Sequence, residues 1–265
     1  MKTPTRLVAA CACCSALPAY AGASCEVSSG PGTAALVELY TSEGCSSCPP
    51  ADRQLSELGK LARAAGTDLV AIPLGLHVGY WDQIGWKDVF AQKAFETRQA
   101  RLAAAGKGGF VYTPQFFVNG RELRQWNRGL PDAIHKANLT PAQARITLKW
   151  AVGPGNTVRV EADGAALAAG GDRALFVAIS ESELVTKVLR GENSNVTLRH
   201  DDTVRDWAAP VRLVNGSARL ERELTLAPDW KPQNLRAVAF VQDLSSGAVL
   251  QAVSTASCGQ PGKSR

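Results

Sequence analysis

The feature that most constrains the fold of this chain is a pair of cysteines, two residues apart, between an apolar segment and a helical pattern. The apolar run 34–40 predicts a buried strand, and the motif Cys45-Ser46-Ser47-Cys48 follows it closely. Leucines then recur at helical spacing over residues 54–65, and Gly66 ends this pattern. The expected order is therefore strand, cysteine loop and helix.

Two thiols at the start of a helix can form a redox-active disulfide, because the backbone N–H groups and the helix dipole stabilise a thiolate. The motif alone is also compatible with a structural disulfide or with half of a metal site. A four-cysteine zinc site would need a second matching pair, which the sequence lacks, and its three histidines are widely separated. A copper(I) site would favour methionine ligands, and Met1 is the single methionine. The sequence therefore favours a redox pair and predicts no metal and no cofactor.

The first 23 residues have the features of a secretory signal peptide. Two basic residues precede the apolar stretch 7–17, and small residues follow it around Ala21 and Ala23. Cleavage after either alanine predicts a periplasmic or secreted protein. The segment Val8-Ala9-Ala10-Cys11 also resembles a lipoprotein cleavage site, although few apolar residues precede it.

The chain has seven cysteines, and three of them lie within the expected signal peptide. Exported proteins commonly carry disulfides because their compartment is oxidising. Once Cys45 and Cys48 are paired, Cys25 and Cys258 remain, near the two ends of the mature chain. Chain ends often lie close together at the surface, so we expect a structural disulfide between these two. The alternative is that either is a free thiol.

The composition is that of an ordinary folded protein, with 45% hydrophobic and 20% charged residues. Lys and Arg number 29 against 24 Asp and Glu, a net charge of +5, and no long basic run occurs. A nucleic acid or a membrane surface is therefore not expected as a partner. Apart from the short signal-peptide run, no segment approaches the roughly 18 apolar residues of a spanning helix, so no membrane span is expected.

The sequence pattern changes near residue 141. Strands alternate with helices over residues 24–141, and Asn119-Gly120 is typical of a hairpin turn before a last helix near 129–138, which predicts an α/β domain. Residues 142–258 instead show short, partly alternating runs that predict an all-β sandwich-like domain, with 259–265 as a flexible tail. Its seven expected strands lie at 145–150, 157–161, 174–180, 184–189, 217–226, 235–242 and 248–254.

Longer motifs resemble a known family. Residues 38–52 (ELYTSEGCSSCPPAD), 76–88 (with LHVGYWD and GWKD) and 111–115 (VYTPQ) are together similar to the exported bacterial domain-of-unknown-function family 1223. Weaker similarity continues through Arg190-Gly191-Glu192-Asn193 and His200. The strand–CxxC–helix order followed by a threonine–proline pair also resembles the thioredoxin superfamily, which implies a thioredoxin-like first domain. The activity of family 1223 is not established.

The resemblance implies roles at the cysteine site. Cys45 would be the attacking thiol and Cys48 the resolving one. Pro114 would follow a cis peptide bond and lie against the pair, the alternative being an ordinary turn proline. Glu38 would shuttle protons beneath the cysteines, the alternative being a paired strand carboxylate, because an unpaired buried charge is costly. Gly79 departs from the family pattern, in which an acidic residue is expected.

Other residues near these motifs are candidates for substrate binding. Tyr80, Trp81, Asp82 and Trp86 are predicted to form a wall or lid over the cysteines that binds a peptide or a small thiol, and Thr113 is a further candidate for substrate binding. Large aromatic residues are more often simply part of a core, which is the alternative.

The remaining polar residues of the motifs are interpreted as structural. His77 ends the second expected strand, over residues 68–77, and is interpreted mainly as a structural histidine. Asp52 and Lys87 are interpreted as surface or capping charges. Asp88 is expected to cap a helix that runs to Ala105 and stops at Gly106.

Two hypotheses for function follow. The first is an exported thiol–disulfide oxidoreductase that acts through Cys45 and Cys48 on protein or small-molecule thiols and disulfides. The second is a non-catalytic binding or structural protein in which the same pair is a permanent disulfide. The sequence leaves the question of enzyme activity and the oligomeric state open.

Overall fold

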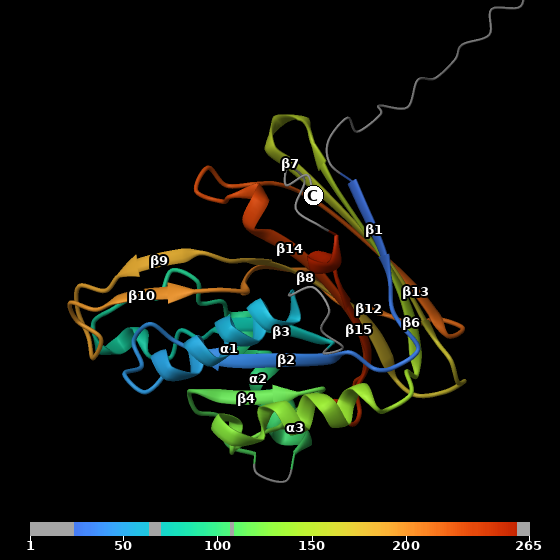
Figure 1. The fold of residues 1–265 in the computed structure, drawn as a ribbon, viewed down its shortest axis with the longest axis horizontal. Coiled ribbons are helices and arrows are strands. Elements are labelled where there is room, and N and C mark those ends of the chain that lie inside the picture. The colour runs from blue at the N-terminus through green and yellow to red at the C-terminus, as the bar shows by residue number, and fades with distance from the viewer. Residues whose placement is uncertain (1–23, 64–69, 107–108, 259–265) are drawn as a thin grey trace, which may run out of the picture.

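The computed structural model describes residues 24–63, 70–106 and 109–258. The expected signal peptide, residues 1–23, and the expected tail, residues 259–265, lie outside the described residues. The rest forms two large β-sheets, a separate two-stranded sheet, and three long helices gathered at one end of the largest sheet (Figure 1).

The first part of the chain forms four strands and three helices around the cysteine loop. Strand β2 is parallel to β3 and antiparallel to β4, which pairs with β5. Helices α1 and α3 pack on one face of these strands, and α2 packs on the other. The elements are β2 (Ala35–Thr41), α1 (Pro49–Ala62), β3 (Ala71–His77), α2 (Lys93–Ala105), β4 (Gln115–Val118), β5 (Arg121–Glu122) and α3 (Trp126–Asn138).

The larger sheet continues without a break into the second part of the chain. Its order is β15-β14-β8-β11-β3-β2-β4-β5, and β12 also pairs with β8. Strand β11 makes the junction, because it is parallel to β3 on one side and antiparallel to β8 on the other. The added strands are β8 (Arg173–Glu181), β11 (Thr203–Trp207), β12 (Val211–Arg212), β14 (Leu235–Asp243) and β15 (Val249–Ser254).

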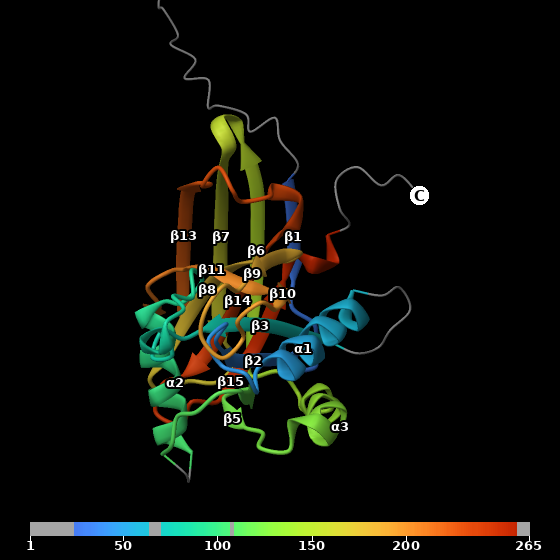
Figure 2. The ribbon, with the colours of Figure 1, turned by 90° about the vertical axis from the view of Figure 1, so that its left-hand side faces the viewer.

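A second, four-stranded sheet packs against β8, β14 and β15 (Figure 2). Alternating side chains of its strands, such as Ile146 and Val160, meet Leu175 and Val241 in the space between the sheets, as in a β-sandwich. The strands are β1 (Ser24–Ser28), β6 (Ala144–Gly153), β7 (Thr157–Ala166) and β13 (Ser217–Thr225). A separate hairpin of β9 (Leu184–Lys187) and β10 (Thr197–His200) lies beside α1 (Figure 1).

One buried cluster joins the two parts of the chain. Tyr40 and Leu74 from the first part share it with Phe176 and Phe240 from the second. The predicted boundary at residue 141 therefore does not separate two independent sheets, because β11 and this core connect elements from both sides of it.

The disulfide expected between Cys25 and Cys258 is present, with 6.0 Å between the two Cα atoms. It joins β1 to the residue that follows the short 3₁₀ turn after β15. Strand β1 pairs with β6, so the beginning of the described chain belongs to the second sheet. The bond thus fastens both ends of the described chain to one end of the sandwich.

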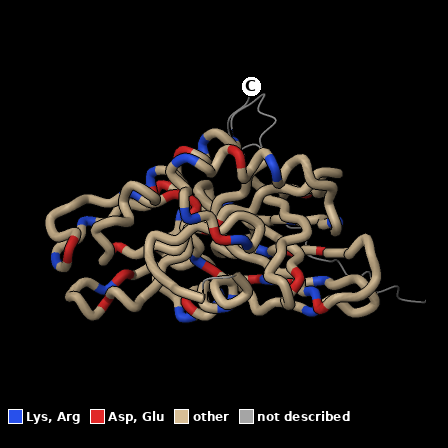
Figure 3. The backbone as a smooth tube through the Cα atoms, turned by 90° about the horizontal axis from the view of Figure 1, so that it is seen from below, with Lys and Arg blue, Asp and Glu red and all other residues tan. Residues whose placement is uncertain are grey.

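Acidic and basic residues are interspersed along the chain (Figure 3). On β7 and β13, Arg219 forms ion pairs with Glu161 and Asp163 across the two strands and with Glu221 on its own strand. Among the described residues, no helix is both long and apolar enough to cross a membrane.

Candidate functional site

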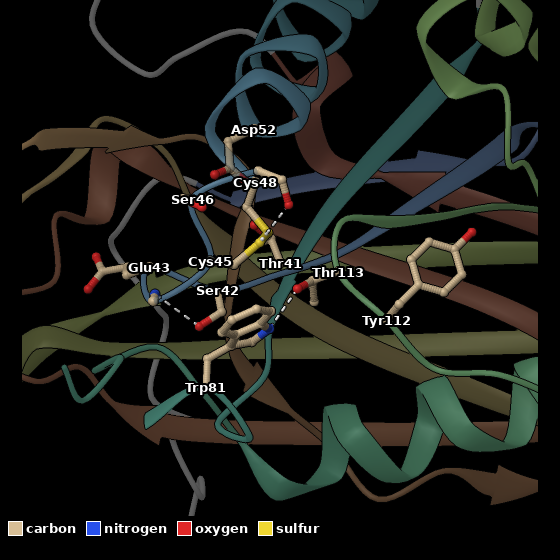
Figure 4. The surroundings of a disulfide bond; sticks show 12 residues. Thr41, Ser42, Glu43, Cys45, Ser46, Cys48, Asp52, Trp81, Tyr112 and Thr113 are labelled. Atoms are coloured by element: carbon tan, nitrogen blue, oxygen red, sulfur yellow. Dashed lines mark hydrogen bonds between the residues drawn. A yellow bond between two sulfur atoms is a disulfide. The ribbon is translucent and has the colours of Figure 1, made fainter. Parts of the chain in front are cut away.

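The Cys45–Cys48 disulfide lies where β2 passes into α1 (Figure 4). The two Cα atoms are 5.4 Å apart, and Cys48 is the N-cap residue of α1, with prolines in the first two helical positions. This start agrees with the rule that proline suits the first turn of a helix. Ser46 and Ser47 are exposed, whereas both cysteines are fully buried. A partner thiol therefore reaches the sulfur atoms only if a covering group moves.

One group of residues that covers the disulfide lies in the segments that precede α2 and β4. Trp81 Nε1 donates a hydrogen bond of 2.7 Å to Thr113 Oγ1, and Figure 4 shows this pair beside the disulfide. The backbone passes close by as well, because a Cβ atom on Gly44 would lie 3.0 Å from Trp81 Cβ. The peptide bond between Thr113 and Pro114 is cis, as the resemblance implied. Trp81 and Thr113 thus lie beside the cysteines.

A second cover comes from the loop between β9 and β10, about 150 residues further along the chain. Asn193 Nδ2 donates to the carbonyl oxygens of Glu43 and Cys45, at 2.9 and 3.0 Å. Glu192 Oε2 accepts a hydrogen bond of 3.0 Å from the Ser46 N–H. Asn193 is buried, so its two bonds hold the loop against the cysteine segment in a region with little water, whereas the Glu192–Ser46 bond is exposed.

Glu43 connects the cysteine loop to a buried polar cluster. Its carboxylate points away from the disulfide in Figure 4. It accepts a hydrogen bond of 2.7 Å from Trp86 Nε1 and lies 3.2 Å from His200 Nε2. His200 belongs to β10, so both parts of the chain contribute to this cluster.

His77 and Asp88 form the neighbouring pair in this cluster. His77 Nδ1 lies 2.7 Å from Asp88 Oδ2, which also accepts the Glu43 N–H at 2.8 Å. Burial lowers the pKa of His77, but the carboxylate of Asp88, together with those of Asp52 and Glu43, outweighs this and holds it above its ordinary value. Burial raises the pKa of Asp88, but His77 and two backbone N–H groups hold it below its ordinary value. The His77 ring also meets the His200 ring edge to face, at 4.8 Å between centroids.

The structure corrects two sequence-based interpretations in this cluster. Asp52 is not a surface charge: it is 8% exposed and accepts a hydrogen bond of 2.8 Å from Thr41 Oγ1. Burial raises the pKa of Asp52, and the neighbouring histidines only partly offset this effect. Asp88 does not cap α2, which begins at Lys93, because its carboxylate is engaged by His77 and by backbone N–H groups. Lys87 is exposed, as expected.

Glu38 is a paired carboxylate, which was the alternative to a proton shuttle. Its two oxygens accept hydrogen bonds of 2.5 and 2.9 Å from Arg98, and Tyr40 donates a weaker one at 3.3 Å. Arg98 in turn lies over the rings of Trp207 and Phe240. Among the described residues, the hydrogen bonds of Glu38 thus go to Arg98 and Tyr40 in the shared core. The buried acid one helical turn beyond Cys48 is Asp52.

Tyr80 and Trp86 are the other two aromatic candidates for substrate binding. Tyr80 is half-buried, with its hydroxyl 3.5 Å from Gln99 Oε1, and Trp86 holds Glu43. At Gly79, a Cβ atom would lie 3.4 Å from the Glu96 carboxylate and 3.5 Å from that of Asp82. An acidic side chain there would face two others, so glycine avoids a like-charge contact.

Comparison with known proteins identifies the family but no activity. The family described as proteins of unknown function, DUF1223, matches residues 36–242. The chain belongs to DUF1223. No curated protein matches it.

Two solved structures resemble this DUF1223 chain. That of a protein from Agrobacterium tumefaciens covers 88% of this chain and 99% of its own, with 24% identity and a TM-score of 0.61. That of HBP35 of Porphyromonas gingivalis covers 89% of this chain and 80% of its own, with 14% identity and a TM-score of 0.64. At these identities the likeness concerns the fold alone.

Sequence reasoning did not assign a role to several residues that the structure brings to the cysteines of this DUF1223 protein. Glu43 lies in the cysteine motif, two residues before Cys45, and its position in the sequence did not indicate a separate role. Glu192, Asn193 and His200 come from the distant hairpin, and their weak family resemblance was the signal that pointed to them. Within the described ranges, no three or more His, Cys, Asp or Glu side chains are arranged to hold a metal ion.

Proposed function

We propose that this DUF1223 protein carries out thiol–disulfide exchange through Cys45 and Cys48 in an oxidising compartment, on a thioredoxin-like unit formed by β2–β5 and α1–α3. The observation that carries the proposal is the position of the disulfide. It lies at the N-terminus of α1, where the helix dipole favours a thiolate, and beside the segment with the cis Thr113–Pro114 bond.

The exchange step requires only the pair and a partner dithiol. A partner thiolate attacks Cys45 Sγ, and Cys48 leaves as a thiolate that then takes up a proton. A second partner thiol attacks the mixed disulfide and releases Cys45. The partner ends as a disulfide, and the Cys45–Cys48 pair has gained two electrons and two protons. The reverse sequence would oxidise a partner.

The full burial of both cysteines favours the second candidate, a binding or structural protein with a permanent disulfide. Reduction potential separates the two candidates. A couple above about −300 mV exchanges with cellular thiols, whereas a lower potential marks an inert bridge. We expect the reduction potential of the Cys45–Cys48 pair to lie above this value. Mass spectrometry of acid-trapped thiols in defined glutathione or dithiothreitol buffers measures it.

A double variant without the second bridge, Cys25→Ser with Cys258→Ser, serves as the control and should show the same potential. A Cys48→Ser variant, which leaves Cys45 without its resolving partner, should accumulate mixed disulfides with client thiols, and Cys45→Ser should not. A potential well below about −300 mV together with no trapped mixed disulfide would assign the permanent-disulfide role instead.

A further inference from the structure

We propose that a cavity between α1 and β10 binds a small molecule through its phosphate or carboxylate group. The cavity has a volume of about 560 Å³, which suits a small ligand. Its wall comes from the last turns of α1, the residues that lead into β9, the end of β10 and the start of β14. It therefore joins the two parts of the chain, as ligand sites often do.

Basic side chains outnumber acidic ones in this wall. The lining includes Lys60, Arg63, Arg199 and Arg236 on the basic side, and Glu183 and Asp201 on the acidic side. Lys60 pairs with Glu57 and Arg63 with Asp202. The positive charge offered to a ligand therefore comes from Arg199 and Arg236, which form no ion pair among the described residues.

The acidic residues of the wall are already engaged with the protein. Glu183 Oε2 accepts a hydrogen bond of 3.1 Å from Asn234 Nδ2, and Asp201 Oδ1 accepts one of 2.9 Å from the Glu183 N–H. Behind the wall, the buried Asp202 pairs with Arg63 at 2.9 Å. None of these carboxylates forms an ion pair with Arg199 or Arg236 within the described part of the chain.

Arg236 is the residue that most clearly lacks an anion. It is half-buried, and its Nη1 donates only to the backbone carbonyls of Gln233 and Leu235. Its buried Nε has no hydrogen-bond partner among the described residues. Burial and then the like charge of Arg63 lower the pKa of Arg236, and Asp202 offsets this only in part. A half-buried guanidinium in this state is stabilised by an anion from outside the chain.

The chemistry of the wall selects oxyanions. Guanidinium groups bind phosphate and carboxylate through paired, charge-assisted hydrogen bonds, whereas chloride offers no such geometry. His200 also lines the cavity and lies against Glu43 in the cysteine site. The cavity is nevertheless a separate site, and its ligand binding does not depend on the redox chemistry proposed above.

Calorimetric titration with inorganic phosphate and, separately, with citrate tests the proposal on the full protein at constant ionic strength set by chloride. We expect saturable binding of one ion per chain to at least one of the two, and the stronger of them indicates the group that the natural ligand carries. Arg236→Gln should weaken that binding at least tenfold. Arg128→Gln, an exposed arginine of α3 outside the cavity, should leave it unchanged.

Arg199 is exposed, so Arg199→Gln preserves the fold even if Arg236→Gln does not, and it should also weaken binding severalfold. Absence of saturable binding of both probes would overturn the proposal, as would equal losses in Arg199→Gln and Arg128→Gln. Cys45→Ser should bind the probe as tightly as the parent protein, which separates failure of this site from failure of the proposed exchange activity.

Discussion

At the scale of single residues, burying the Asp52 carboxylate has a free-energy cost that its charged and hydrogen-bonding partners only partly offset. Its carboxylate is buried beneath the cysteine loop, and burial raises its pKa above the ordinary value. The folded state thus binds a proton more tightly than the unfolded chain does. Stability is lost as pH rises from the unfolded pKa through the higher folded pKa, and it stays lower above that range.

An Asp52→Asn variant should therefore be more stable than the parent protein at pH 7. The amide carries no charge and keeps an oxygen to accept the Thr41 hydrogen bond. The advantage should shrink as pH falls toward the unfolded pKa of an aspartate, about 3.9. Urea unfolding between pH 3 and 7 measures it, with Asp132→Asn on the exposed face of α3 as the control. A variant less stable than the parent at pH 7 would contradict this account.

The residues at the site differ in how readily the sequence reveals them. Cys45 and Cys48, the cis bond before Pro114 and Trp81 all belong to local motifs, and the structure places them as expected. Asp52 looks like an ordinary first-turn acid of a helix. Its burial depends on a neighbouring hairpin, which no local pattern could indicate.

At the scale of elements, the strands predicted in the second part of the chain are those whose apolar residues form a run or alternate with polar ones. All seven strands expected between residues 145 and 254 are present, as β6–β9 and β13–β15. Strands β10 and β11 were not expected, because they are short and rich in polar side chains. Strand β11 nonetheless joins both parts of the large sheet. Strand β11 pairs with strands that are distant from it in the sequence, so its own residues carry little information about this pairing.

The β9–β10 hairpin should control access to the disulfide. Asn193→Ala removes two hydrogen bonds to the cysteine loop, each worth about 1 kcal/mol net. The two bonds together are worth about 2 kcal/mol, so the pair should be reduced roughly thirtyfold faster by a small phosphine, since 1.4 kcal/mol corresponds to a factor of ten. Mass spectrometry of alkylated samples follows the rate under native conditions.

Thr197→Ala, at an exposed position of β10, provides the matched control and should react at the parent rate. Equal rates for Asn193→Ala and the parent protein would mean that the Trp81–Thr113 pair alone limits access.

At the scale of the whole molecule, the shared core predicts that both parts of the chain unfold together. Phe240 is fully buried, stacks on Phe176 and lies beneath the Arg98 guanidinium that holds Glu38. Phe240→Ala should lower the free energy of unfolding by about 3–5 kcal/mol. Hydrogen exchange should show the loss in β2 as well as in β14. Loss of protection in β14 alone would show that the two parts are independent folding units.

The Cys25–Cys258 disulfide closes nearly the whole described chain into a covalent ring, with a sequence separation of 233 residues. A mechanical load applied through segments outside this bond passes from one cysteine directly to the other. The hydrogen-bonded strands then bear none of it. A force between the two ends of the described chain would therefore leave the cysteine site and the proposed anion cavity undistorted.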